Sequence, residues 1–292
     1  MKIIHLDPEH PTETVIQIEG LRRSITLMHI TDSHLHLADE RDPEALELIK
    51  SKKAKRPDVH EHFIEALARS NESEVDATIF TGDITNFPSW AAIDTIANGV
   101  ATLSAPYLYT LGNHDWHFPF LDWNDATRDE YYPRFEGLID GDPRCQAKEI
   151  SGVKLIALDN SNYQISMAQM DFVKEELETG MPCLLFIHIP IFVRTLLNPV
   201  LARWKTPIMM AATEGWTEET RATSPEFLPN ETTLEFHKYL TEGACDNIAA
   251  ICCGHVHFSH ADAFRAGRFQ YVTNAGFDGD SRLIRLEPYS SN

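Results

Sequence analysis

Five apolar, β-rich runs in this chain each end in polar residues that can bind a metal ion. The runs cover residues 24–30, 77–80, 106–111, 183–187 and 247–253. Several of them alternate with helical segments, and apolar runs of this kind are typical of strands buried on both faces. Because the polar residues follow the carboxyl ends of the runs, the pattern predicts an α/β sheet with its functional site along one edge.

The polar residues at these ends are carboxylates, imidazoles and one amide. They are Asp32, His34, Asp83, Asn113, His188, His255 and His257. Imidazole and carboxylate ligands suit Zn, Mn, Fe or Ni, and the set contains no thiol. Seven candidates exceed one tetrahedral shell, but they fit two ions if one carboxylate bridges them. We therefore expect a metal site built from several strand ends.

Coincidence is a poor explanation for this set, because five separate segments would have to produce it independently. A single histidine at a strand end is more often structural than a ligand, and we interpret eight others in that way. These are His5, His10, His29, His60, His62, His117, His237 and His260. His114 differs from them because it lies within Gly112-Asn113-His114-Asp115, where an imidazole can move protons and a carboxylate can fix its tautomer.

The charge of the chain limits its partners. Its 292 residues carry a net charge of −19, which argues against nucleic acid and against an anionic membrane surface. The basic run Lys50–Arg56 is a local exception, and we interpret it as a solvated helix face or loop. No apolar run approaches the roughly 20 residues of a membrane span. The first residues form no secretory signal, so we expect a cytoplasmic protein.

The five cysteines support a reducing compartment. Their number is odd, and four of them sit in or beside apolar stretches, which favours buried, inert thiols. Cys252 and Cys253 are adjacent in a predicted strand, so their side chains should point to opposite faces. This arrangement does not suit a shared metal ion.

Periodicity and turn residues predict the remaining elements. We expect a strand over residues 14–18 that forms a hairpin with the run at 24–30, and a hairpin of strands at 146–150 and 154–158. Helices are predicted from residue 59 onward, over 89–103, over 166–179 with a capping box of Ser166 and Gln169, and from a cap at Thr232 with Glu235 to Gly243. Closing strands are expected at 270–273 and 283–286. We expect one domain over residues 1–292, in which the loop-rich segment 191–229 is a candidate lid or substrate loop.

The ordered blocks resemble the signature of a known superfamily. Asp32-x-His34, Gly82-Asp83, Gly112-Asn113-His114-Asp115, His188 and Gly254-His255-x-His257 resemble the calcineurin-like metallophosphoesterases over about residues 25–275. The resemblance implies an α/β fold in which two mixed β-sheets pack as a sandwich with helices on the outer faces.

The same resemblance assigns roles to the site residues. It implies that Asp32, His34 and His257 hold one metal ion, that Asn113, His188 and His255 hold the other, and that Asp83 bridges the two. His114 would protonate the leaving oxygen or stabilise the transition state, and Asp115 would orient it. Enzymes of this superfamily carry pairs of Mn, Fe or Zn ions.

The expected reaction is hydrolysis of a small-molecule phosphoester. Two cations about 3.5–4 Å apart polarise a phosphoryl oxygen and lower the pKa of a bound water, and the resulting hydroxide attacks phosphorus in line. A protonated imidazole assists departure of the leaving oxygen. The compact size and the Gly-Asn-His-Asp form resemble bacterial class III cyclic-nucleotide phosphodiesterases, so we expect a phosphodiesterase, with a cyclic nucleotide as one candidate substrate.

Several alternatives stay open at this stage. Ile189, where that group often has a second histidine, and the long segment 191–229 both depart from the group's pattern. A phosphomonoesterase, a nucleotide pyrophosphatase and a glycerophosphodiesterase are alternatives, as is a non-catalytic binding scaffold with this fold. A protein phosphatase is not favoured, because the motifs around the arginines of those enzymes are not evident, and a nuclease is disfavoured by the charge. Trp204, Trp216, Arg194 and Arg203 either bind a base and phosphate or pack within the protein. The sequence does not fix the oligomeric state.

Overall fold

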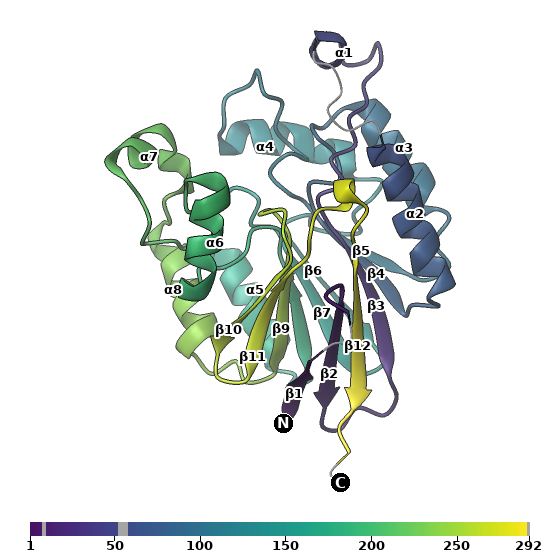
Figure 1. The fold of residues 1–292 in the computed structure, drawn as a ribbon, viewed down its shortest axis with the longest axis vertical. Coiled ribbons are helices and arrows are strands. Elements are labelled where there is room, and N and C mark those ends of the chain that lie inside the picture. The colour runs from purple at the N-terminus through teal and green to yellow at the C-terminus, as the bar shows by residue number, and fades with distance from the viewer. Residues whose placement is uncertain (8–9, 52–57, 291–292) are drawn as a thin grey trace.

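Two mixed six-stranded sheets pack face to face, and helices cover the outer face of each (Figure 1). The computed structural model describes residues 1–7, 10–51 and 58–290. The expected sandwich is therefore confirmed. Most of the basic run Lys50–Arg56 lies outside the described residues.

The first sheet brings three candidate-bearing strands together. Its strands in spatial order are β1 (Ile3–Leu6), β2 (Glu13–Ile18), β12 (Arg282–Pro288), β3 (Ile25–Ile30), β4 (Ala77–Thr81) and β5 (Tyr107–Thr110). β3, β4 and β5 are parallel. Their carboxyl ends therefore meet at one edge of the sheet, as predicted.

The second sheet supplies the other two site strands. Its order is β10 (His260–Arg265), β11 (Arg268–Val272), β9 (Ile248–Cys253), β8 (Cys183–Phe186), β7 (Val153–Leu158) and β6 (Cys145–Ile150). β7, β8, β9 and β11 are parallel. The β6–β7 hairpin turns at Ser151 and Gly152, which both have positive φ angles, as a tight two-residue turn requires.

The core forms three apolar layers. One layer lies between the sheets and includes Leu27, Leu184 and Phe186, while the other two lie under the helices. Cys252 belongs to the layer between the sheets and Cys253 to an outer layer, which confirms that adjacent strand residues face opposite sides. All five cysteines are free thiols, and four of them are buried.

Helices on the outer face of the first sheet follow the predicted spacing. α2 (Val59–Glu72) buries Phe63 and Leu67, one helical turn apart, and α3 (Trp90–Val100) packs beside it (Figure 1). Two further helices, α1 (Pro43–Ser51) and α4 (Asp125–Tyr131), were not predicted. A 3₁₀ helix, η1 (Tyr132–Phe135), follows α4.

Two helices on the second sheet test the predicted caps. α5 (Met167–Leu177) begins with the expected capping box of Ser166 and Gln169. The cap of α8 (Glu231–Glu242) was predicted wrongly at Thr232. Asn230 is the N-cap, and its side chain accepts a hydrogen bond from the main-chain N–H of Thr233. The helix ends at Gly243, as expected.

Two predictions of organisation were wrong. The strands β2 and β3 do not form a hairpin, because β12 inserts between them from the other end of the chain. The segment 191–229 is not loop-rich, because it contains α6 (Arg194–Trp204), α7 (Glu218–Thr223) and the 3₁₀ helix η2 (Pro225–Phe227). Pro199 lies inside α6, and an internal proline argues against a helix when the sequence alone is considered.

One observation bears on membranes. Within residues 1–7, 10–51 and 58–290, no helix has both the length and the apolar character needed to cross a bilayer.

Candidate metal centre

The strand ends bring the predicted ligands into two neighbouring groups that share one carboxylate. Asp32, His34, Asp83 and His257 form the first group, and Asp83, His188 and His255 form the second. Within each group the candidate ligand atoms lie within 4.8 Å of one another. Asn113 joins the second group, since its Oδ1 lies 3.1 Å from His188 Nε2. The seven candidates therefore converge on one place.

The first group is arranged around the Asp32 carboxylate. Asp32 Oδ1 lies 3.2 Å from His257 Nε2 and 3.8 Å from His34 Nε2. His34 Nε2 is in turn 3.6 Å from Asp83 Oδ2. These separations allow one metal ion to lie at ordinary coordination distances from all four side chains.

The second group is arranged around His188. Its Nε2 lies 3.3 Å from Asp83 Oδ2 and 3.2 Å from His255 Nδ1. The opposite nitrogen, Nδ1, donates to the carbonyl oxygen of Thr81 at 2.7 Å, which leaves Nε2 free to face the site. Asp83 Oδ2 thus lies between a histidine of each group.

The chemistry of these groups fits metal ions. Asp32 Oδ1 is buried and has no hydrogen-bond partner among the described residues, although a buried carboxylate oxygen is costly to leave unpaired. It faces the ring nitrogens of His34 and His257, and carboxylate with imidazole is a donor set for Zn, Mn or Fe. The residues present therefore fit a two-cation centre.

An unusual backbone conformation aims these side chains at the site. Positive φ angles, between 48° and 69°, occur at Asp32, His34, Asp83, His255 and His257. Residues other than glycine adopt this region at a cost of about 1–3 kcal/mol each, and such residues cluster at functional sites. The Asp-x-His and His-x-His pairs thus converge through left-handed turns at the strand ends.

Gly254 allows two of these turns to meet. A Cβ atom at Gly254 would lie 2.2 Å from Asp32 Oδ2 and 2.1 Å from Thr31 Oγ1. The same Asp32 oxygen accepts a hydrogen bond from the main-chain N–H of His255 at 2.9 Å. Only glycine leaves room for this contact between the two sheets.

The expected role of Asp115 as the orienter of His114 was wrong. Its carboxylate accepts four hydrogen bonds, from the main-chain N–H groups of Asp83, Gly112 and Thr85 and from the Thr85 hydroxyl, all at 2.8–2.9 Å. All four donors belong to the loop that carries Asp83 or to the loop that carries His114, and among the described residues the His114 ring makes its hydrogen bond to Asn86 instead. Asp115 therefore joins two site loops.

His114 is oriented by Asn86 instead. Its Nδ1–H donates to the Asn86 carbonyl oxygen at 3.1 Å, and its main-chain N–H donates to Asp83 Oδ1 at 2.7 Å. The Asn86 side chain also contacts the first group, because its Oδ1 lies 3.3 Å from His34 Nδ1. The His114 ring is nearly perpendicular to the His34 ring, with centroids 4.7 Å apart, so it lies beside a candidate ligand of the first group.

Burial and mutual attraction determine the protonation of the centre. Burial lowers the pKa of His114 to about 4, so that the imidazole is neutral at pH 7. Burial opposes ionisation of Asp83 and His188, but their attraction outweighs it, lowering the pKa of the Asp83 carboxyl and raising that of His188 to about 9. Without metal, the Asp83 carboxylate thus retains a proton on His188, and a cation competes with that proton for the same place.

Comparison with known proteins identifies the family. The sequence pattern described as calcineurin-like phosphoesterase matches residues 25–259. The chain belongs to this family. No curated protein sequence matches the chain significantly.

Two solved structures share the calcineurin-like phosphoesterase fold. A dimetal phosphatase from Danio rerio superposes with a TM-score of 0.52 at 11% identity, over 87% of this chain and 88% of that one. A purple acid phosphatase from yellow lupin (Lupinus luteus) seeds gives 0.55 at 10% identity, over 94% of this chain but only 56% of its own. At these identities the likeness concerns the fold alone.

Sequence reasoning missed several residues around the centre of this calcineurin-like phosphoesterase. Asn86 lies three residues after Asp83 in the same strand-end turn, and its side-chain amide, a polar group at a strand end, was the signal that could have identified it. Tyr163 follows β7, whose end was not among the five considered, and its hydroxyl lies 2.8 Å from His255 Nε2. The eight histidines interpreted as structural contribute no atom to either ligand group among the described residues.

Trp204, at the end of α6, reaches the centre from the segment 191–229. Its indole N–H donates to the carbonyl oxygen of Val256 at 2.9 Å, and its ring centroid lies 5.2 Å from that of His257. The side chain remains 37% exposed. Trp216 donates instead to the Ala212 carbonyl of its own segment. Of these two tryptophans, Trp204 is the one that both packs and presents a surface beside a candidate ligand.

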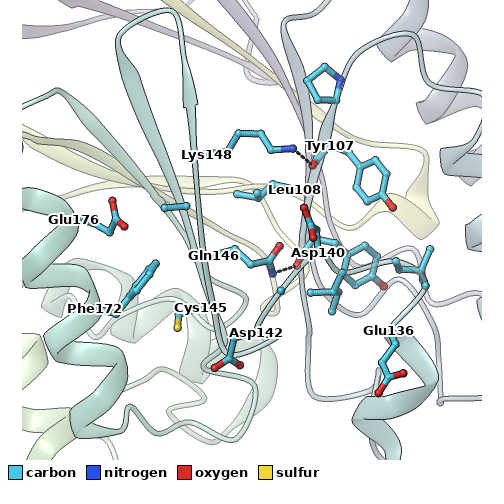
Figure 2. A pocket seen from close by; sticks show the side chains of 17 residues that line it. Tyr107, Leu108, Glu136, Asp140, Asp142, Cys145, Gln146, Lys148, Phe172 and Glu176 are labelled. Carbon is cyan, nitrogen blue, oxygen red and sulfur yellow. Dashed lines mark hydrogen bonds between the residues drawn. The ribbon is translucent and has the colours of Figure 1, made fainter.

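A separate groove of about 660 Å³ lies where the edge strands β5 and β6 face each other (Figure 2). Gln146 and Lys148 extend from β6 and donate to the carbonyl oxygens of Tyr109 and Tyr107, at 2.7 and 3.4 Å. None of the seven candidate ligands lines this groove. The side chains of Gln146 and Lys148 thus satisfy main-chain carbonyl groups at the β5 edge of the first sheet.

Proposed function

We propose that this chain is a two-metal phosphoesterase that hydrolyses a phosphodiester, with a cyclic nucleotide as one candidate substrate. One observation carries the proposal: Asp83 Oδ2 lies 3.6 Å from His34 Nε2 of the first group and 3.3 Å from His188 Nε2 of the second. A carboxylate in that position can bridge two cations. The family match and the burial of the site support the same interpretation.

The proposed ligands follow from the two groups. Asp32, His34 and His257 would hold one ion, Asn113, His188 and His255 the other, and Asp83 would bridge them. We propose Mn, Fe or Zn for both positions, because nitrogen and oxygen ligands suit these metals. When bound, such a pair polarises a phosphoryl oxygen and lowers the pKa of water from 15.7 towards about 7.

His114 is the proposed catalytic imidazole. Its Nδ1–H is held by Asn86, so its Nε2 is the nitrogen free to exchange a proton with the substrate. The ring is neutral at pH 7 in the metal-free protein. A bound phosphate anion favours the imidazolium by attraction, so that a proton taken up with the substrate can pass from Nε2 to the leaving oxygen.

The segment 191–229 is proposed to form a substrate wall within a single domain. Trp204 offers an aromatic surface beside His257, and the Arg203 guanidinium lies 5.7 Å from its ring centroid. A flat aromatic group on the alcohol side of an ester, such as a nucleobase, can stack there. The net charge of −19 favours a small substrate over a polynucleotide. The free, mostly buried thiols support a cytoplasmic location.

Hydrolysis of two model esters tests the proposal. After loading with Mn²⁺, the protein is assayed with bis-p-nitrophenyl phosphate and with p-nitrophenyl phosphate, and Asn113→Ala is the control. We expect preference for the diester and loss of that activity in the control. Preference for the monoester would instead favour a phosphomonoesterase. No turnover of either ester with two ions bound would contradict an enzyme of this class and favour the binding scaffold.

A further inference from the structure

Tyr163 is a buried tyrosine held in a left-handed turn next to the metal centre. It lies in the loop between β7 and α5, is 2% exposed, and has a φ angle of 68°. Its main-chain N–H donates to the Asn160 carbonyl oxygen at 2.8 Å, which closes the turn. A bulky residue in this conformation is rare and costs free energy, so the surrounding contacts must hold it there.

The Tyr163 hydroxyl contacts the back of one candidate ligand. It lies 2.8 Å from His255 Nε2, while His255 Nδ1 lies 3.2 Å from His188 Nε2 on the site side. A neutral imidazole carries one proton. If that proton is on Nε2, it is donated to the tyrosine oxygen and the Nδ1 lone pair faces the site. The opposite tautomer would place a proton where the second ion binds.

The segment 191–229 holds Tyr163 from its other side. The Phe227 ring, in η2, stacks on the Tyr163 ring with centroids 4.0 Å apart and planes 22° apart. The next residue, Gln164, fastens the same two segments together, because its amide group donates to the carbonyl oxygens of Glu226 and Leu228. The Gln164 side-chain oxygen also accepts a hydrogen bond from the main-chain N–H of Asn230 at 2.9 Å.

We propose that Tyr163 is a positioning residue that fixes His255 in the tautomer presenting Nδ1 to the second metal ion, and that Phe227 holds Tyr163 in place. The proposal rests on the proposed two-metal function. It makes the segment 191–229 part of the support of the metal centre as well as a substrate wall. Outer partners of this kind affect metal affinity about 10–100-fold.

Tyr163→Phe separates this role from simple packing, because it removes the hydroxyl and keeps the stacked ring. The matched control is Tyr132→Phe: Tyr132 is also buried, and its hydroxyl has no hydrogen-bond partner among the described residues. Binding of Mn²⁺ to the metal-free proteins is measured by isothermal titration calorimetry, together with the urea midpoint in EDTA.

In Tyr163→Phe we expect the dissociation constant of the second ion to rise about 10-fold or more, with the first ion bound as in wild type. The urea midpoint should differ little from that of Tyr132→Phe. Phe227→Leu should raise the dissociation constant of the second ion by a smaller factor, since the Tyr163 hydroxyl remains but the Tyr163 ring loses its stacking partner. Wild-type affinity for both ions in Tyr163→Phe would overturn the proposal, and wild-type affinity in Phe227→Leu would overturn the part assigned to Phe227. Fewer than two ions bound by the wild type would refute the two-metal function itself.

Discussion

Replacing Asp115 tests whether this carboxylate joins two site loops or acts through His114. Asp115→Ala leaves the main-chain N–H groups of Asp83, Gly112 and Thr85 without their acceptor in a buried place. Each unsatisfied donor costs about 1–3 kcal/mol. Because water can enter the space and recover part of this, we expect the free energy of unfolding to fall by about 4 kcal/mol.

The assay is urea unfolding in EDTA, so that metal binding does not contribute. At pH 8 the Asp115 side chain is ionised, because burial and the neighbouring Asp83 raise its pKa only to about 7. With an m-value of about 2–3 kcal/mol per M, the expected loss moves the midpoint down by about 1.3–2 M. Asp159→Ala is the control, since Asp159 is also buried but, among the described residues, its carboxylate accepts a hydrogen bond from only one main-chain N–H group, that of Ser161. It should cost about 1 kcal/mol.

The outcome distinguishes two roles for Asp115. Displacement of these loops should also lower the affinity for both metal ions, because Asp83 would lose its fixed position. A variant that unfolds within about 1 kcal/mol of wild type and binds both ions, but has lost turnover, would refute this reasoning and restore Asp115 as the orienter of His114.

Three further perturbations probe the centre and the fold. Gly254→Ala should abolish binding of the first ion, measured by metal analysis after gel filtration, because the new Cβ would lie 2.2 Å from Asp32 Oδ2; normal metal content would contradict this close approach. His114→Ala should lower turnover about 10²–10³-fold at unchanged metal content; loss of both ions would assign His114 a structural role. Burial lowers the pKa of His29 to about 3 in the folded protein, from about 6.5 in the unfolded chain. As the pH falls below about 6.5, the unfolded chain therefore binds a proton at His29 before the folded protein does, and the free energy of unfolding decreases. In EDTA between pH 6 and 4, His29→Gln should therefore lose about 1.4 kcal/mol less stability per pH unit than wild type, and an equal slope would contradict the low pKa.

The parts of the molecule that could be predicted from sequence are those determined by residues close together in the chain. The apolar runs identified β3, β4, β5, β8 and β9, and the residues at their ends converge as expected because parallel strands end at one edge of a sheet. The turn at Ser151 and Gly152 and the cap at Ser166 are local as well. In each case neighbouring residues contain the cause of the structure.

The parts that were missed depend on distant residues. The insertion of β12 between β2 and β3 joins the two ends of the chain, and no local pattern encodes it. α6 forms despite Pro199 because its apolar face is buried against the core of the second sheet. Asn86 and Tyr163 were missed because their roles arise from contacts with His114 and His255, which the fold alone brings close.

The most direct test of the two-metal account is the initial rate of bis-p-nitrophenyl phosphate hydrolysis measured against the number of Mn²⁺ ions bound per chain. The account predicts little turnover with one ion and a steep rise as the second binds, with loss of the rise in Asp83→Asn. Full turnover with a single ion, or no turnover with two, would contradict it.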